Sequence, residues 1–388
     1  KHSEFKAAPG KVPAYLQSAA LMIDSDTGNV LAYVGGRDYA HSQYDFIELG
    51  RRPFGTTYLP VVYAAALESG RHPCTTVRDE AMDARAVAVG AQEGILGEWG
   101  MEVLNPQYEG RISSVRALAA SKLAATVRLG RELSLEEVAN QARAFGFPVG
   151  EGELLTRMLL GYDSVSLKEA VRAYSAISRK GVLPGDLRYI ERIENADGEV
   201  VYQADPAEKP DTDPACDEIT AYQIHDMLRE SLGNGNLAAE ASTLRQQPFT
   251  GAVKTGTTHE FADGWCVGYN GKVALGVWIG FHQGKEAIYE NAFGRQLVFP
   301  PWSEVMNVAE ESYPGTEIES PEGLSLVKVC SESGLRATRY CYESMEDPVK
   351  GRSFRYTGHT ELLRAARRKL GLCDIHGKGG IGTNEVLE

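Results

Sequence analysis

The stretch that decides the fold runs from residue 251 to residue 280 and reads GAVKTGTTHEFADGWCVGYNGKVALGVWIG. Apolar, β-branched and aromatic runs along it predict strands over residues 250–254, 264–269 and 273–281. The dipeptide Asn270-Gly271 separates the last two runs and is typical of a tight hairpin turn. The stretch therefore predicts neighbouring strands of one antiparallel sheet.

The flanking sequence adds further strands and a helical middle. Hairpins are predicted over residues 19–36 and 188–204, where Asp, Asn and Gly residues supply the turns. Helices are predicted over residues 57–69, 112–129, 134–145, 166–179, 217–232 and 301–311. Strands at both ends around a helical insert predict an α/β (α+β) fold, with helices covering a central antiparallel sheet and a mostly helical subdomain beside it. A cleft at their junction is the usual place for a ligand.

Composition excludes some partners. The chain has 388 residues and a net charge of −13, which argues against a nucleic-acid partner because phosphate binding needs Lys and Arg. No apolar run approaches the length of a membrane span. The chain opens on Lys1 rather than Met, which favours a processed protein or an expressed fragment and leaves open a membrane anchor before Lys1.

Six cysteines are few for this length. Cys330 and Cys341 flank a short turn-like stretch, and a disulfide between them is plausible in an oxidising compartment. A zinc site that also uses Cys373 and His376 is the competing interpretation, but the ligand spacing is irregular, so we expect no metal. The remaining cysteines are expected to act as small apolar residues: Cys74, Cys216, Cys266 and Cys373.

The first predicted strand of the opening stretch ends in Lys254-Thr255-Gly256-Thr257. Lys-Thr-Gly is one of three short motifs of the serine acyl-transferases that process cell-wall peptides or hydrolyse β-lactams; the other two are Ser-x-x-Lys and Ser-x-Asn. A cation, two hydroxyl groups and a glycine on one strand suit an extended peptide with a terminal carboxylate, bound by strand addition. Gly256 would allow the ligand backbone to approach closely.

Residues 251–280 resemble the corresponding segment of penicillin-binding proteins almost throughout. Residues 24–36 look like the first hairpin of the class A, bifunctional members of that family, and residues 105–110 match the approach to the second motif. The resemblance covers roughly residues 18–312 and implies a penicillin-binding-protein or serine β-lactamase-like transpeptidase fold. The expected organisation is a linker, a transpeptidase-like domain and a C-terminal tail module, over residues 1–17, 18–312 and 313–388.

The resemblance places the nucleophilic serine of the family on Thr56 and its general-base lysine on Leu59. The serine of the second motif falls on Ser121, and the asparagine of that motif falls on Leu123. The first two motifs are then not intact, and no complete catalytic set is expected, since a hydroxyl nucleophile needs a partner that takes its proton and a leucine cannot do so. Loss of a general base typically lowers the rate by a factor on the order of 10² to 10⁴.

The third motif is intact, so substrate binding is expected at Ser121, Lys254, Thr255, Gly256 and Thr257. Both lost polar positions became leucine, which avoids leaving a buried polar group without a partner. We therefore expect an acylation centre refilled with hydrocarbon, in which Lys254 bonds Ser121.

The resemblance implies a domain of cell-wall (peptidoglycan) biogenesis in the periplasm or on the outer face of the cytoplasmic membrane. We expect it to be inactive as a D,D-transpeptidase and to act as a peptidoglycan-binding or scaffolding module without a cofactor. Its expected partners are peptidoglycan stem peptides or cell-wall synthesis proteins. Two alternatives stay open: an active transpeptidase or carboxypeptidase that uses Thr56, with Lys254 as base, and a fragment of a bifunctional glycosyltransferase–transpeptidase whose upstream domain is active.

Overall fold

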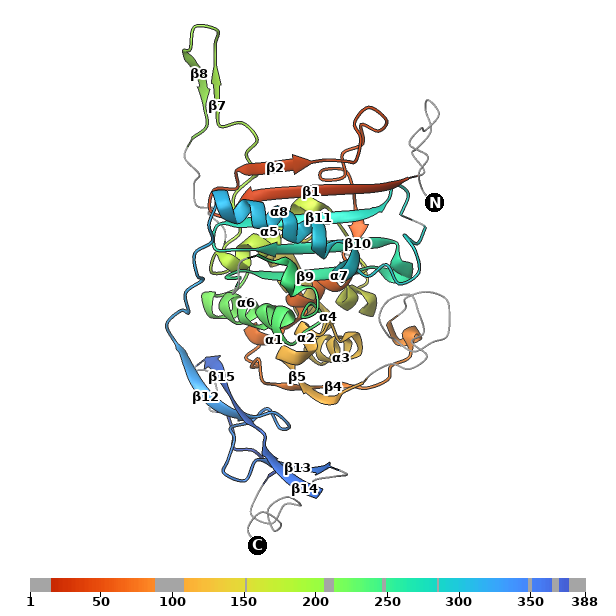
Figure 1. Ribbon diagram of the computed structural model, residues 1–388, viewed down its shortest axis with the longest axis vertical. Helices are drawn as coiled ribbons and strands as arrows, with labels where there is room; N and C mark the ends of the chain where they lie inside the picture. The colour runs from red at the N-terminus through yellow and green to blue at the C-terminus, as the bar shows by residue number, and fades with distance from the viewer. Residues whose placement is uncertain are drawn as a thin grey trace.

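The protein was analysed as a computed structural model, which describes residues 15–87, 108–150, 152–205, 213–245, 249–284, 286–347, 351–364 and 370–376. A five-stranded sheet with the strand order β2-β1-β11-β10-β9 forms its centre (Figure 1). The strands are β1 (Leu16–Asp24), β2 (Val30–Val34), β9 (Ala252–Thr257), β10 (Asp263–Tyr269) and β11 (Val273–Phe281). All four pairings are antiparallel, and β1 pairs with β11, so the predicted sheet of sequence-distant strands is confirmed.

Helices cover the two faces of this sheet because successive side chains of a strand point to opposite faces. On one face, Cys266 and Leu275 pack with Trp302 of α8. On the other face, Val267 packs in the large core to which α5 contributes Val171. The helices are α1 (Leu59–Glu68), α2 (Ser114–Ala119), α3 (Leu123–Leu133), α4 (Leu135–Ala144), α5 (Leu167–Ser178), α6 (Glu218–Gly233), α7 (Gly294–Leu297) and α8 (Phe299–Ser312).

Capping residues fix where several helices begin. The side chains of Ser134, Ser166 and Asp217 each accept a hydrogen bond from the backbone N–H three residues later, at the starts of α4, α5 and α6. Together α1, α2, α3 and α4 form the expected helical subdomain, which lies below the sheet in Figure 1.

The prediction of one helix over residues 112–129 is wrong. A short strand, β5 (Gly110–Ser113), precedes α2. The helix is interrupted between α2 and α3, and this interruption is called the break below. At the break Ser121 adopts a left-handed backbone conformation with φ 56°. Apolar spacing continues on both sides of the break, so the periodicity alone did not reveal it.

Short two-stranded pairs and single turns complete the domain. The hairpin predicted over residues 188–204 is confirmed and projects from the sheet in Figure 1. The remaining strands are β3 (Arg52–Pro53), β4 (Thr76–Asp79), β6 (Ser164–Val165), β7 (Arg192–Glu194) and β8 (Val200–Gln203). The 3₁₀ turns are η1 (Gly55–Tyr58), η2 (Ala84–Val87), η3 (Thr156–Leu160), η4 (Ala241–Thr243) and η5 (His259–Phe261). None of the helices among the described residues is long and apolar enough to span a bilayer.

The C-terminal segment folds into two small two-stranded sheets at the opposite end from the β7–β8 hairpin (Figure 1). Their strands are β12 (Leu324–Cys330), which pairs with β15 (Gly358–Arg364), and β13 (Tyr342–Asp347), which pairs with β14 (Gly351–Tyr356). Arg364 Nη2 lies 2.5 Å from Asp217 Oδ1, and Gln223 Nε2 donates to the carbonyl of Leu362 over 3.0 Å. These contacts attach the segment to α6.

The cysteine predictions need correction. Among the residues that the structure describes, all six cysteines are buried free thiols, so the expected Cys330–Cys341 disulfide is not formed. Cys373 is not an isolated apolar residue either, because its sulfur lies with those two and His376 in one cluster. The turn-like spacing of Cys330 and Cys341 predicted their proximity, but distant Cys373 joins them only through the fold.

Candidate functional site

A cleft of about 360 Å³, open to solvent, lies where the edge of the sheet meets the helical subdomain. Its lining comes from segments that are far apart in the sequence: Thr56, Ser121, Leu123, Asn236, Thr255, Thr257, Phe293 and Arg295. The structure thus brings the positions of the three expected motifs together at the predicted junction.

Thr56 lies in η1, the 3₁₀ turn that leads into α1, and Pro60 occupies the first turn of that helix, where its missing N–H is tolerated. The hydroxyl of Thr56 is almost fully buried and donates to the backbone carbonyl oxygen of Thr255 over 3.1 Å. A peptide carbonyl can accept this hydrogen bond but cannot take up the proton at neutral pH. This hydrogen bond therefore fixes the orientation of the Thr56 hydroxyl.

Leu59, at the expected lysine position, is the first residue of α1 and is fully buried. It belongs to the main hydrophobic core and is not one of the described residues that line the cleft. Leu123, at the expected asparagine position, does line the cleft. Leu59 therefore extends the hydrophobic core, and Leu123 gives the cleft an apolar wall.

Ser121 occupies the break between α2 and α3, and its hydroxyl oxygen accepts two hydrogen bonds. Lys254 Nζ donates over 2.7 Å, which confirms the predicted bond, and Asn236 Nδ2 donates over 3.1 Å. The left-handed backbone of Ser121 is one that a non-glycine residue adopts only when its surroundings hold it there.

Lys122, the next residue, holds this break from the other side. Its Nζ atom lies 2.9 Å from carboxylate oxygens of both Asp79 and Glu109. Burial opposes the charge of Lys122, but the hydrogen bonds to Glu109 and Asp79 outweigh it and raise the pKa of the ammonium. A hydrogen bond from Arg116 lowers the pKa of the Glu109 carboxyl, burial opposes this shift, and a hydrogen bond from Lys122 adds to it. The resulting pKa is about 2. Lys122, between the motif positions Ser121 and Leu123, thus has a structural role as the partner of two carboxylates.

Lys254 lies in β9 and is fully buried. Besides Ser121 Oγ, its Nζ atom donates to the carbonyl oxygen of Thr255 over 2.8 Å, the same oxygen that Thr56 binds. Lys254 is not among the described residues that line the cleft. Its charge therefore acts on the cleft from behind Ser121 and Thr255 rather than by open contact.

Gly256 allows a close contact within the protein itself. A Cβ atom at this position would lie 2.8 Å from Thr57 Oγ1 and 3.0 Å from the carbonyl oxygen of Phe54. A Cβ atom on Gly55, whose φ is +58°, would lie 2.5 Å from the carbonyl oxygen of Thr257. The two glycines allow η1 to lie directly against β9. The expectation that Gly256 also lets a ligand approach closely stays a prediction.

Three cleft residues were missed by the sequence analysis: Asn236, Phe293 and Arg295. Asn236 follows α6, and its backbone N–H donates to the carbonyl of Ala119 over 3.0 Å. Within the described part of the chain, the buried Oδ1 atom of Asn236 has no hydrogen-bond partner. The guanidinium of Arg295 lies 4.4 Å from the centre of the Phe293 ring. No local sequence signal identifies these residues, because loop contacts alone place them in the cleft.

Thr257 contributes to the cleft through a bond with the loop before α7. Its hydroxyl oxygen accepts a hydrogen bond from the backbone N–H of Gly294 over 2.9 Å. This bond fixes the segment that carries Phe293 and Arg295 against β9. The cleft thus presents a cation, hydroxyl groups and two apolar walls beside an edge strand, features that suit an extended peptide with an anionic end.

Comparisons with known proteins agree with this geometry. The profile described as "Penicillin binding protein transpeptidase domain" matches residues 18–288. Penicillin-binding protein 1A of Neisseria lactamica is 29% identical over 311 residues, which cover 80% of this chain and 38% of that protein. Penicillin-binding protein 2D of Bacillus subtilis (strain 168) is 29% identical over 324 residues, which cover 82% of this chain and 45% of that protein. This chain thus spans less than half the length of these relatives.

A solved structure shows the same fold. The crystal structure of penicillin-binding protein 1A from Haemophilus influenzae superimposes with a TM-score of 0.77 at 20% sequence identity. The match covers 94% of this chain and 55% of that one, so it includes the C-terminal segment as well as the sheet and helices.

Proposed function

Because this chain belongs to the family of penicillin-binding-protein transpeptidase domains, we propose that its cleft binds the peptide of peptidoglycan without forming an acyl-enzyme. The observation that carries the proposal is the hydrogen bond from Thr56 Oγ1 to the carbonyl of Thr255, next to a leucine at the position of the general base.

Acylation requires the hydroxyl oxygen to attack a carbonyl carbon while its proton moves to a base. In this cleft the proton of Thr56 points at a backbone carbonyl, and Leu59 has no group that could accept it. The β-methyl of threonine also restricts χ1 and so hinders rotation of the hydroxyl towards a substrate. These features support a cleft that does not form an acyl-enzyme but can still bind a peptide.

Binding would use the features that remain. β9 is the edge strand of the sheet, so a peptide could add alongside it, with Thr255 and Thr257 facing the ligand. Arg295 would pair with the terminal carboxylate, and Asn236 Oδ1 would accept a hydrogen bond from a peptide N–H. Leu123 and Phe293 would cover the alanine methyl groups.

The proposal places the protein in cell-wall biogenesis outside the cytoplasm, where its relatives' substrate is found. A peptide-binding domain without turnover would position wall strands for neighbouring synthesis proteins. An upstream glycosyltransferase domain would fit the same role, since this chain covers 38% of penicillin-binding protein 1A of Neisseria lactamica.

Calorimetric titration tests the proposal. An acetylated tripeptide that ends in D-Ala-D-Ala should bind, and the same peptide with an amidated C-terminus should bind at least about tenfold more weakly, because a charge-assisted bond is worth roughly 1.5–3 kcal/mol. Arg295→Gln should weaken binding of the free acid and leave binding of the amide unchanged. Release of D-Ala that disappears in Thr56→Val would overturn the proposal.

The strongest rival is an active enzyme that uses Thr56 with Lys254 as base. One observation favours it, since both side chains bond the same carbonyl oxygen and must therefore lie near each other. The rival predicts turnover of the free-acid peptide that is lost in Lys254→Met. Our proposal predicts no turnover in either protein.

A further inference from the structure

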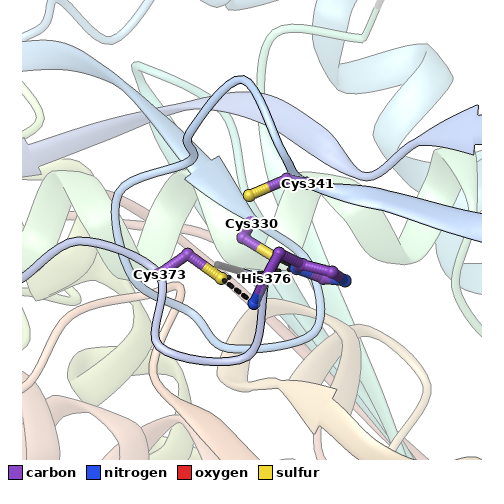
Figure 2. Close-up of side chains that lie close together, drawn as sticks. All are labelled: Cys330, Cys341, Cys373 and His376. Carbon is purple, nitrogen blue, oxygen red and sulfur yellow. Dashed lines mark hydrogen bonds between the residues drawn. The ribbon is translucent and has the colours of Figure 1, made fainter. Parts of the chain in front are cut away.

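Four side chains with metal-binding atoms converge in the C-terminal segment, far from the cleft in sequence. Figure 2 shows the sulfurs of Cys330, Cys341 and Cys373 and the ring of His376 gathered around one point. Their ligand atoms all lie within 4.8 Å of one another, and all four residues are buried. From this geometry we propose a structural zinc site of the Cys₃His type.

The distances within the cluster fit a tetrahedral ion. Zinc–sulfur bonds of about 2.3 Å and zinc–nitrogen bonds of about 2.0–2.1 Å, at a tetrahedral angle, place sulfur and nitrogen about 3.5 Å apart. His376 Nδ1 lies 3.5 Å from Cys330 Sγ and 3.4 Å from Cys373 Sγ. Both distances match those expected around zinc, which binds thiolate and imidazole in closed four-coordinate sites.

The surroundings of the ligands provide an independent second observation. Glu332 Oε1 lies 3.4 Å from His376 Nε2, the ring nitrogen that faces away from the sulfurs. A carboxylate on this nitrogen fixes the ring so that Nδ1 carries the lone pair, as in carboxylate–histidine–zinc triads. Thr338 N–H lies 3.1 Å from Cys341 Sγ, and His376 N–H lies 3.5 Å from Cys373 Sγ. Both N–H groups would stabilise thiolate charge.

A disulfide explains this arrangement less well. Sulfur atoms in a disulfide are about 2.05 Å apart, and pairing any two of the three cysteines would leave the third thiol and the imidazole without a role. A metal uses all four side chains at once. Binding Zn²⁺ would displace the three thiol protons to solvent, so the filled site would carry one negative charge.

The described part of the segment has little apolar core. Its largest apolar cluster contains the buried residues Val329 and Leu363, with Cys74 of the main domain. Small units with so little core are commonly held together by metals or disulfides. The proposed ion would join the end of β12 (Cys330), the residue just before β13 (Cys341) and the segment at residues 370–376. It would stabilise the segment in place of a larger apolar core. The site would be structural rather than catalytic, because protein side chains would fill all four ligand positions.

The experiment uses the whole chain, purified without chelator. Elemental analysis should give one zinc per chain, and cobalt substitution should give the absorption bands of a tetrahedral cobalt–thiolate centre. Cys373→Ser should lose the stoichiometric metal, whereas Cys216→Ala removes a buried cysteine outside the cluster and should retain it. Glu332→Gln should keep the stoichiometry and weaken zinc affinity by roughly 10- to 100-fold.

Two outcomes would overturn the proposal. One is a wild-type protein without zinc whose mass shows a disulfide between two of the three cysteines. The other is a protein that takes up no cobalt while all three thiols react with a thiol reagent. The cobalt spectrum is read on the wild type, so a failure of Cys373→Ser to fold does not affect it.

Discussion

Lys254 Nζ lies 2.7 Å from Ser121 Oγ, and this bond joins the edge strand of the sheet to the break between α2 and α3. The lysine is fully buried, so the bond is made where water competes little. It thereby links two of the segments that surround the cleft.

A double-mutant cycle tests this bond. Lys254→Met and Ser121→Ala should each lower the free energy of unfolding, and the two effects should not add. A coupling of about 1.5–3 kcal/mol is expected for a hydrogen bond to a charged group. Urea unfolding of the four proteins gives the value. Additive effects would mean that the contact contributes nothing to stability.

Asp263 should make the domain less stable as the pH rises, whereas most Asp carboxyls have the opposite effect. Burial raises the pKa of this carboxyl to about 6, although Arg52 and the hydrogen bonds from Trp278 and Thr258 act in the opposite direction. The folded protein then binds this proton more tightly than the unfolded chain, whose pKa is near 3.8. The stabilising contribution of the proton is present below about pH 4 and is lost as the pH rises to 6, for a total of about 3 kcal/mol.

Comparison with Asp263→Asn isolates this effect. The stability of the wild type minus that of the variant should fall by about 3 kcal/mol between about pH 4 and pH 7, and stay constant at higher pH. Denaturant unfolding at several pH values measures it. A difference that grows with pH would mean that the charge of Arg52, 3.9 Å away, dominates.

Gly55 should tolerate no side chain. Its φ of +58° is unfavourable for alanine by roughly 1–2 kcal/mol, and a Cβ atom would lie 2.5 Å from the carbonyl oxygen of Thr257. Gly55→Ala should therefore lower the free energy of unfolding by more than that amount. Gly233→Ala is the matched control, because no atom lies within 4 Å of the added Cβ and the residue is helical. Equal effects in a melting experiment would contradict the close contact between η1 and β9.

Restoring the lost side chains should restore acylation only in part. The triple variant Thr56→Ser/Leu59→Lys/Leu123→Asn should react with a fluorescent penicillin slowly, since a lysine at the fully buried position 59 would lose its hydration. Thr56→Ser alone should remain unlabelled, because the base is still missing. Equal labelling rates of the single and triple variants would show that position 59 does not control the chemistry.

The sheet was predictable because its signals are local. Alternating apolar runs define the strands, and Asn270 makes the turn by accepting backbone hydrogen bonds from Lys272 and Val273. The break at Ser121 was not predictable from periodicity, because a single left-handed residue leaves the apolar spacing of both neighbouring helices unchanged.

The candidate site likewise contains contacts that the sequence predicted and contacts that it did not. The bond between Lys254 and Ser121 followed from the family resemblance and the need of both groups for a partner. Asn236 could not be predicted, since its place depends on a backbone bond to Ala119 from a loop remote in sequence. The contact of Gly256 with η1 was not predicted, because a sequence indicates that a close approach occurs at a glycine but not which neighbour makes it.

Intact-protein mass spectrometry after incubation with benzylpenicillin measures whether Thr56 can form an ester. We expect the mass of the protein to stay unchanged over times at which an active penicillin-binding protein, treated in parallel, is fully labelled. A mass increase of one whole penicillin molecule, located by peptide mapping to Thr56, would contradict the proposal that this cleft binds wall peptides without chemistry.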